Sequence, residues 1–327
     1  SDIGEGSDAS EVFFELANAP IVAYRLKATA ESRARSGANN DKEPNGESEC
    51  NDQIITVRQN SSVQEHTGGI VWETSYLLAS YLLERPPPLG KVLEIGSGCG
   101  MLGLVLAASG LASSVILTEC AEVMDDLRSN VERNIAAEDA NSLSPDVVSA
   151  RQLRWDCLEE DVASPDDAQR SGKDASVHVH QLKPHSFDTI IGTDVVFTPT
   201  LVRPLLACLA LMAHKRTHIY LCLQIRCADS HALLLKKASK FGLRVEDRTE
   251  SAFREECASC SWGIDMDCKL LHISVKTTKK DTVILKRGAM KESGAKMAKN
   301  ENTKKRKEMS SREDGETTKL RKHRRKT

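Results

Sequence analysis

The stretch VLEIGSGCG, residues 92–100, decides how the rest of the chain is interpreted. A short apolar segment leads into the acidic Glu94 and then into three glycines at alternate positions, Gly96, Gly98 and Gly100. Glycine has no Cβ atom, so its backbone can turn at positive φ and lie directly against a ligand. The apolar segment 101–109 that follows predicts a helix whose free N–H groups face the same turn. The stretch therefore predicts a strand, a ligand-binding turn and a helix.

The glycine spacing separates two kinds of nucleotide-like cofactor. A dinucleotide fingerprint has glycine at the first, third and sixth positions, and Met101 stands at the sixth position here. Glycines at the first, third and fifth positions after Glu94 instead resemble motif I of the seven-strand S-adenosylmethionine-dependent methyltransferases, whose loop holds the methionine part of the cofactor. A second acid, Glu119, ends the apolar segment 115–118 and follows Gly98 by 21 residues, a spacing that suits the ribose hydroxyls of either cofactor.

Composition bounds the class of protein. The 327 residues are 40% hydrophobic, which is enough to bury a core. Residues 276–327 hold 19 Lys and Arg against 7 Asp and Glu, whereas residues 1–275 hold 26 against 40, so an acidic domain precedes a basic tail. No segment resembles a membrane span or a signal peptide. The ten cysteines form no dense framework and fit reduced thiols, so we expect a soluble intracellular protein that binds no membrane.

The chain is expected to have three parts. Residues 1–53 form an N-terminal segment, whose apolar positions in 11–27 can dock on the core, followed by a polar linker. Residues 54–276 form the main domain, interrupted at about 159–186 by an insertion that we expect to be disordered. Residues 277–327 lose all apolar periodicity and predict a disordered basic tail.

Short apolar strands alternate with helices through the main domain. The predicted strands are 92–95, 114–119, 148–155, 188–193, 218–225, 243–248 and 268–275. The predicted helices are 72–83, 101–109, 121–135, 200–213 and 229–241. This alternation predicts an α/β fold with a mainly parallel sheet and helices on both faces. Seven strands, with no clear helix between the last two, resemble the seven-strand Rossmann-like methyltransferase sheet, in which the last strand is antiparallel.

Three further motifs resemble methyltransferase family 16, the non-histone protein lysine methyltransferases. They are TGGIVWE at 67–73, LRWD at 153–156 and DVVF at 194–197. The segment LCLQIR at 221–226 also resembles the fifth strand of that family, which ends in a polar pair near the substrate mouth. The resemblance covers roughly residues 54–276.

The resemblance implies roles for individual residues. The residues implied to bind S-adenosylmethionine are Trp72, Glu94, Gly96, Gly98, Gly100, Glu119, Trp155 and Asp156. Asp194 is implied to orient the acceptor amine, and Phe197 to line the lysine channel. Each has a structural alternative, because Trp72 and Trp155 could be core aromatics, Glu94 a buried acid between loops, and Phe197 a packing residue. Asp194 could cap the following helix, although Thr198 or Thr200, together with Pro199, is better placed to begin it.

The predicted function is methylation of a lysine in a non-histone protein by a monomeric enzyme that uses S-adenosylmethionine. Methylation of a protein histidine or of a small molecule stays open as an alternative. So does a catalytically weak binding protein that acts through its basic tail. Methylation of nucleic-acid bases is disfavoured, because Asp194, Val195, Val196 and Phe197 stand where such enzymes have an Asn-Pro-Pro-Tyr-like motif.

A zinc site is the competing interpretation of the last cysteines. Cys257, Cys260, Cys268 and His272 supply three thiols and one imidazole, a ligand set that zinc accepts. However, the gap between the two pairs is shorter than usual, and positions 268, 270 and 272 alternate as one face of a strand. We therefore expect no metal.

Two basic clusters lie in the tail, at 304–307 and 321–326. Clusters of this size serve as nuclear import signals or contact nucleic acid. An import receptor or nucleic acid is thus an expected partner beside the protein substrate, and we expect the protein in both nucleus and cytoplasm.

Overall fold

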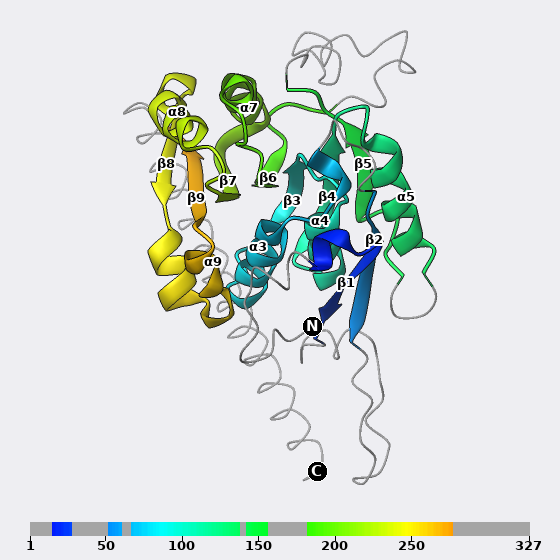
Figure 1. The fold of residues 1–327 in the computed structure, drawn as a ribbon. Coiled ribbons are helices and arrows are strands. Elements are labelled where there is room, and N and C mark those ends of the chain that lie inside the picture. The colour runs from blue at the N-terminus through cyan, green and yellow to red at the C-terminus, as the bar shows by residue number, and fades with distance from the viewer. Residues whose placement is uncertain (1–14, 28–51, 61–66, 138–141, 156–181, 277–327) are drawn as a thin grey trace, which may run out of the picture. The chain divides into compact units, whose positions relative to one another are not determined.

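The computed structural model describes residues 15–27, 52–60, 67–137, 142–155 and 182–276 (Figure 1). The chain divides into two units, residues 1–276 and 277–327, and the second lies outside the described residues. The predicted insertion lies outside them up to residue 181. The last residues of the insertion, 182–186, are described. Leu182 is buried in the cluster that packs between the sheet and α7 (Pro199–Met212), so these residues belong to the folded domain.

Seven strands form one sheet in the order β5-β4-β3-β6-β7-β9-β8. They are β3 (Gly90–Ile95), β4 (Ala112–Glu119), β5 (Val148–Gln152), β6 (Phe187–Thr193), β7 (Ala213–Gln224), β8 (Leu243–Asp247) and β9 (Cys268–Val275). Neighbours pair in parallel, except that β9 pairs antiparallel with both β7 and β8. The predicted seven-strand sheet, with its last strand antiparallel, is confirmed.

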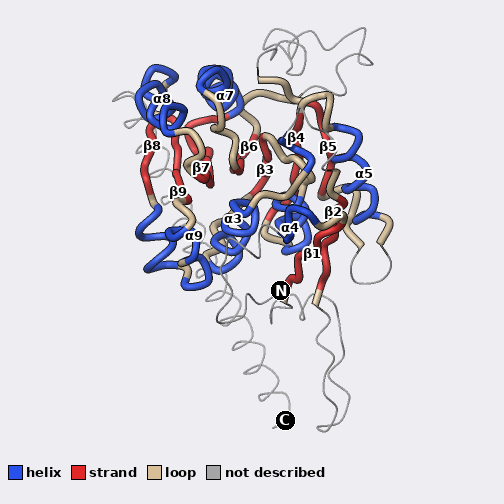
Figure 2. Tube along the Cα trace, in the orientation of Figure 1, coloured by secondary structure: helices blue, strands red, loops and turns tan. Residues whose placement is uncertain are grey.

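Helices cover both faces of this sheet (Figures 1 and 2). One face packs against α3 (Glu73–Glu84), α4 (Met101–Ser109) and α5 (Met124–Ile135), and the other packs against α7 (Pro199–Met212) and α8 (Ala228–Ala238). Each face has its own cluster of buried side chains, which is the arrangement that a mainly parallel sheet requires. Within the described residues, no helix has the length and apolar content needed to cross a membrane.

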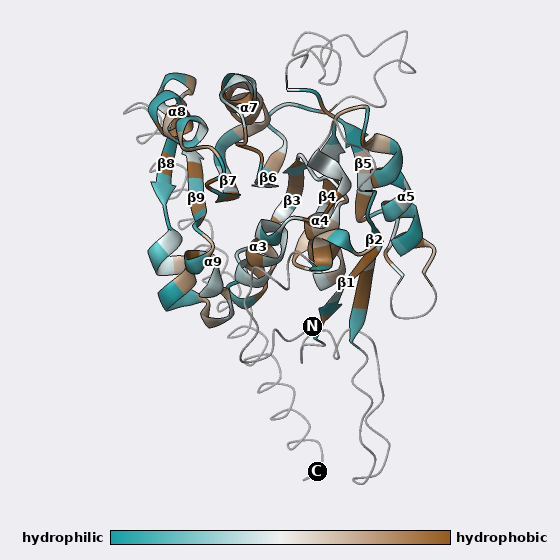
Figure 3. Ribbon diagram, viewed as in Figure 1, coloured by the Kyte–Doolittle hydropathy of each residue, from teal (hydrophilic) through white to brown (hydrophobic). Residues whose placement is uncertain are grey.

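Local sequence explains where the helices begin and end. Pro199 occupies the first turn of α7 after an extended Thr198, as predicted, because proline at that position loses no hydrogen bond. Helix α5 has Asp125 and Asp126 in its first turn and Arg133 in its last, which complements the helix dipole. Most of α5 is coloured hydrophilic in Figure 3, whereas α4 is apolar and buried for most of its length.

The connection between β8 and β9 differs from the prediction. It contains a π-helix (Ser251–Glu256), a 3-10 turn (Ala258–Cys260) and the short α9 (Trp262–Asp265), so the expectation of no helix there was wrong. Each piece is too short to leave a helical period in the sequence. Phe253 is fully buried, and Gly263 lies so close to Leu77 that a Cβ would come within 2.5 Å of its side chain, so this connection packs tightly on α3.

Part of the N-terminal segment belongs to the same packed layer as α4 and α5. Strand β1 (Ile21–Leu26) pairs antiparallel with β2 (Gln53–Arg58), and the inward side chains of both strands are buried in that layer. Asn130 and Asn134 of α5 hold β2: the Arg58 N–H donates to the Asn130 amide oxygen at 2.8 Å, and the Asn134 amide donates to Thr56 O at 2.8 Å. The docking predicted for residues 11–27 therefore holds for the described strand.

Candidate functional site

The glycine loop after β3 is the first part of the site. Gly96, Gly98 and Gly100 have φ values of 60°, 53° and 85°, the left-handed conformation that the sequence predicts. A Cβ on Gly96 would lie 2.9 Å from Val195 Cγ1 and 3.3 Å from the Trp155 ring, and one on Gly98 would lie 3.1 Å from Gly68 O. Side chains at these two positions would therefore collide with the loops on either side.

Gly100 has a different surrounding from the other two glycines. A Cβ there would lie 2.7 Å from Leu127 of α5 and 2.9 Å from Leu117 of β4. Gly100 begins α4 from a left-handed conformation, and its own N–H donates to Ser97 O at 2.8 Å. In this structure, the missing side chain of Gly100 makes room for the core, and a contact with a cofactor stays a prediction.

Glu94 lies inside the protein beneath the loop. One of its carboxyl oxygens, Oε2, accepts the Gly103 N–H of α4 at 3.1 Å. Burial raises the pKa of this carboxyl to about 8, while hydrogen bonds from Ser97 and Gly103 act in the opposite direction. Glu94 is thus protonated at neutral pH, and it ties the first turn of α4 to the end of β3.

Glu119 ends β4 beside the same loop. Its Oε2 accepts the N–H of Cys120 at 2.9 Å, and a Cβ on Gly68 would lie 3.3 Å from its Oε1. Burial raises the pKa of Glu119 to about 7, and backbone N–H groups of Cys120 and Gly98 oppose the rise. A carboxyl with this pKa exchanges its proton near neutral pH, so a hydroxyl donor from a ligand would favour the ionised form.

The two predicted cofactor tryptophans have different surroundings. The Trp155 ring lies against Gly96 and packs on the buried cluster of the α7 face. The Trp72 indole N–H donates to Thr67 O at 3.0 Å, and its ring lies under the guanidinium of Arg226, which is 4.4 Å from the ring centroid. The remaining cofactor candidate, Asp156, lies outside the described residues.

Asp194 directly follows β6 and has an unusual backbone, with φ at 50°. Its N–H donates to Cys222 O at 3.0 Å, and its Oδ1 accepts the Gln224 N–H at 2.7 Å, so the end of β7 fixes the residue. The other oxygen, Oδ2, is buried and makes no hydrogen bond; its cationic neighbour, Arg226 Nη2, is 3.6 Å away. Burial raises the pKa of Asp194 to about 6, and the Gln224 N–H, the Arg226 charge and the nearby Thr74 hydroxyl limit the rise.

Glu73 and Arg226 complete this group, and the sequence analysis assigned neither of them a role. Arg226 Nη2 donates to Glu73 Oε1 at 2.6 Å across 153 positions of the chain. Both residues stand inside quoted motifs, Glu73 directly after Trp72 and Arg226 at the end of LCLQIR. That position within the motifs is the signal that could have identified them.

Phe197 stands between the buried Val196 and the first turn of α7. Its side chain is 40% exposed, which is unusual for a large apolar residue in this domain. An exposed aromatic ring three residues after Asp194 is accessible from solvent, and its role in a lysine channel stays a prediction.

The four proposed zinc ligands do not gather in one place. Cys260 Sγ contacts Leu77 O at 3.6 Å, and Cys268 Sγ contacts Met266 O at 3.9 Å. His272 Nε2 instead lies 3.1 Å from His218 Nδ1, in a stack of rings on β7 and β9. Among the described residues, no three His, Cys, Asp or Glu side chains are close enough together to hold a metal ion.

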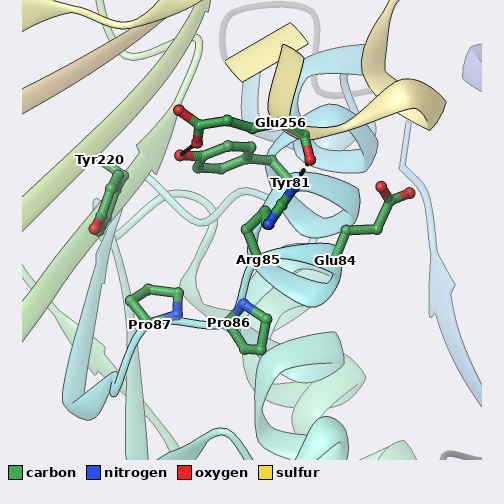
Figure 4. A pocket seen from close by; sticks show the side chains of 7 residues that line it. All are labelled: Tyr81, Glu84, Arg85, Pro86, Pro87, Tyr220 and Glu256. Atoms are coloured by element: carbon green, nitrogen blue, oxygen red, sulfur yellow. Dashed lines mark hydrogen bonds between the residues drawn. The ribbon is translucent and has the colours of Figure 1, made fainter. Parts of the chain in front are cut away.

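A cavity of about 430 Å³ opens at the far end of α3 (Figure 4). Its lining residues are Tyr81, Glu84, Arg85, Pro86, Pro87, Tyr220 and Glu256. In Figure 4, Tyr81 and Arg85 both point to Glu256: the Tyr81 hydroxyl donates to its carboxylate at 3.0 Å, and the Arg85 Nε–H donates to its backbone oxygen at 2.8 Å. None of the predicted site residues lines this cavity. Among the described candidates, Trp155 and Glu119 lie by the glycine loop, and Asp194 lies near the first turn of α3.

Comparisons with known proteins agree with the motifs. The family model described as lysine methyltransferase matches residues 50–169. The human protein-lysine N-methyltransferase EEF2KMT is 27% identical over 211 residues, and the match covers 60% of this chain and 58% of that protein. The mouse protein N-lysine methyltransferase METTL21A is 25% identical over 174 residues, and the match covers 53% of this chain and 67% of that protein. The Arabidopsis thaliana calmodulin-lysine N-methyltransferase is 30% identical over 156 residues, and the match covers 46% of this chain and 41% of that protein.

The family match confirms the resemblance to methyltransferase family 16 that the motifs indicate. It ends at residue 169, so Asp194, Phe197 and Arg226 lie beyond it. The chain also spans little more than half of the length of the human relative, 58%. The roles of residues beyond 169 therefore rest on the geometry described above.

Proposed function

We propose that this chain, which matches the lysine methyltransferase family, transfers a methyl group from S-adenosylmethionine to a lysine side chain of a non-histone protein. The observation that carries the proposal is the open oxygen of Asp194. This oxygen is buried and makes no hydrogen bond. The next residue, Val195, packs its side chain against Gly96, so Asp194 lies close to the glycine loop. A buried acceptor that lacks a partner costs about 1–3 kcal/mol. An acceptor amine beside the cofactor loop would supply the missing donor.

The residues around the loop fit this cofactor. Gly96 and Gly98 turn the loop through left-handed backbones, the sharp turn that a ligand-binding glycine loop needs. Glu119 ends the next strand and offers a carboxyl to ribose hydroxyls, and Trp155 offers an apolar wall beside Gly96. S-adenosylmethionine supplies an electrophilic methyl group on a sulfonium, so the protein has mainly to align the two reactants.

The acceptor chemistry requires a neutral amine. A free lysine has a pKa of about 10.4 and is therefore protonated in water. An apolar surrounding and the nearby sulfonium charge favour loss of that proton. Asp194 Oδ2 accepts one N–H of the amine and so turns the lone pair toward the methyl group. The exposed ring of Phe197 attracts the cationic form of the side chain as it approaches.

The test uses S-adenosylmethionine with a labelled methyl group, the purified full-length chain and a cell extract. We expect label in protein, released on acid hydrolysis as methyllysine, and no label with the Gly98→Arg variant. Label on histidine or on a small molecule would overturn the lysine assignment. Cofactor binding without any transfer would favour the alternative of a binding protein.

We also propose that the basic clusters at 304–307 and 321–326 direct import, so that the protein is present in nucleus and cytoplasm. The charge of the whole tail, 19 Lys and Arg against 7 Asp and Glu from residue 276 onward, supports an import receptor as partner. Deletion of residues 280–327 from a fluorescent fusion should move it to the cytoplasm and leave cofactor affinity unchanged. Unaltered nuclear accumulation would contradict the assignment. Light scattering of the purified chain tests the monomer that we propose.

A further inference from the structure

A cation is held beside Asp194 without occupying its open oxygen. Arg226 Nη2 lies 2.6 Å from Glu73 Oε1 but 3.6 Å from Asp194 Oδ2. The shorter distance is a charge-assisted hydrogen bond, whereas the longer one exceeds hydrogen-bond range. We call Trp72, Glu73 and Arg226 the guanidinium clamp.

We propose that the guanidinium clamp is a positioning element for the acceptor amine: Glu73 and Trp72 hold the Arg226 charge close to Asp194 while its Oδ2 stays free to accept an N–H. The proposal rests on the proposed function and adds two residues to it. In it, Arg226 acts on the acceptor through Asp194 and is not itself a catalytic residue.

Three separate elements position the clamp and Asp194. Glu73 begins α3, Asp194 follows β6, and Arg226 follows β7, where its own N–H donates to Gln224 O at 2.8 Å. The side chains of Glu73 and Asp194 are only 10% and 7% exposed, while that of Arg226 is 37% exposed and covers the Trp72 ring. The acids are thus fixed in the interior, and the arginine reaches them from the surface.

The clamp changes the charge balance around Asp194. Burial favours the protonated carboxyl, and the nearby Glu73 carboxylate acts in the same direction. Arg226 is the cation that opposes both. The thiols of Cys222 and Cys268 also face Asp194, but burial raises the pKa of each above its usual range, so they stay neutral. Arg226 therefore keeps Asp194 ionised near neutral pH, the state in which both its oxygens can accept hydrogen bonds.

The arginine side chain is suited to this task because its planar guanidinium can stack on Trp72 and donate sideways to Glu73 at the same time. A lysine at this position would keep the charge but lose the stacked, fixed geometry. We therefore expect Arg226→Lys to preserve part of the effect and Arg226→Gln to lose it.

The test is the pH profile of methyl transfer to the lysine-containing substrate. In the wild-type chain, kcat/KM should rise with pH through the titration of Asp194, near pH 6. Removal of the cation raises the pKa of Asp194, so in Arg226→Gln this limb should move upward by about one unit. Activity should then fall about 10-fold at pH 5 but only about 2-fold at pH 7, and recover at higher pH, with the S-adenosylmethionine Kd unchanged. Glu73→Gln should move the limb downward, because it removes a carboxylate that raises the pKa of Asp194.

Arg248→Gln is the matched control. Arg248 also pairs with a glutamate, Glu256, next to an aromatic residue, Tyr81, but at the far end of α3. Its loss should destabilise the fold without moving the acid limb. An unmoved limb in Arg226→Gln, or activity lowered equally at every pH, would overturn the inference.

Failure of the proposed function can be separated from failure of the clamp. If the wild-type chain transfers no methyl group to lysine, the proposed function fails at that step. Titration of the Asp194 carboxyl by carbon NMR needs no activity and still compares wild type with Arg226→Gln. An unchanged Asp194 pKa there would overturn the clamp by itself.

Discussion

The two ends of α3 hold similar chemical groups in different states. At its first turn, Glu73 pairs with Arg226 beside Trp72; near its last turn, Tyr81 and Arg248 bond to Glu256. We call these the site end and the cavity end; about 16 Å of helix separates them. The cavity end has an opening of about 430 Å³, and its Glu256 carboxylate has a partner for each oxygen.

The site end leaves buried side-chain oxygens without a hydrogen-bond partner, and one of them is central to the proposed function. That oxygen belongs to Asp194, whose backbone is also held at a positive φ. An unsatisfied buried acceptor and a strained backbone both cost free energy, and proteins retain such costs mainly where they are used. The comparison teaches that incomplete pairing marks the candidate site better than the size of a cavity does.

The largest expected effect concerns the glycine loop. Gly98→Arg should weaken binding of S-adenosylmethionine more than 100-fold in calorimetry, because the side chain occupies the space beside Gly68. Gly242→Arg is the matched control, since Gly242 also has a positive φ, 74°, but has nothing within 4 Å of its Cβ position. It should lower Tm and leave the affinity unchanged. Equal losses in the two variants would show that backbone strain alone, and not the loop's surroundings, explains the result.

The second prediction compares one acid from each end of α3. Asp194→Ala should reduce methyl transfer by about 100-fold and leave cofactor affinity nearly unchanged, because it removes orientation of the amine. Glu256→Ala should reduce stability, since Tyr81 and Arg248 lose their partner, and leave transfer nearly unchanged. Rates and Kd values for both variants test the contrast. A large rate loss in Glu256→Ala, with none in Asp194→Ala, would reverse the assignment of the two ends.

The third prediction concerns the acid that ends β4. Glu119→Ala should weaken S-adenosylmethionine binding about 10-fold, because a charge-assisted hydrogen bond contributes about 1.5–3 kcal/mol. Asp125→Ala is the control, because Asp125 lies nearby at the start of α5 with a side chain that is almost fully exposed. If calorimetry gave the same Kd for wild type and Glu119→Ala, Glu119 would be a structural acid like Glu94.

The smallest expected effect is on stability. Burial raises the pKa of Glu94 from 4.5 to about 8. The folded state therefore binds more protons than the unfolded state between these values, and wild-type stability should fall as pH rises from about 5 to 8. Glu94→Gln removes this titration and should reduce the fall in the unfolding free energy by at least about 1 kcal/mol. Urea unfolding at both pH values measures it, with the exposed Glu132→Gln as control. An unchanged slope in Glu94→Gln would contradict the raised pKa.

The sequence predicted the parts of the site that depend on short segments. The glycine turn, the acids near the ends of β3 and β4, and the position of Asp194 after β6 all follow from a strand and the residues next to its end. Parallel strands bring their carboxyl ends to one edge of the sheet, so these residues had to lie near one another.

Pairings between distant segments could not be predicted in the same way. The contact between Glu73 and Arg226 joins positions 153 residues apart, and its geometry depends on how α3 packs on β7. The packing role of Gly100 depends on Leu127 of α5, which only the folded core brings close. The helical turns between β8 and β9 were missed because each is shorter than the period that reveals a helix.

The position of β9 has a consequence for the order in which this domain can fold. β9 is the last of the described strands in chain order, yet it lies between β7 and β8 and hydrogen-bonds to both. During synthesis, β7 therefore presents an unpaired edge, open to wrong partners, until residues 268–275 have emerged. Asp194 and Arg226 are both held by hydrogen bonds to Gln224, the last residue of β7. The catalytic geometry can thus be completed only in the last stage of folding, after nearly the whole domain has been made.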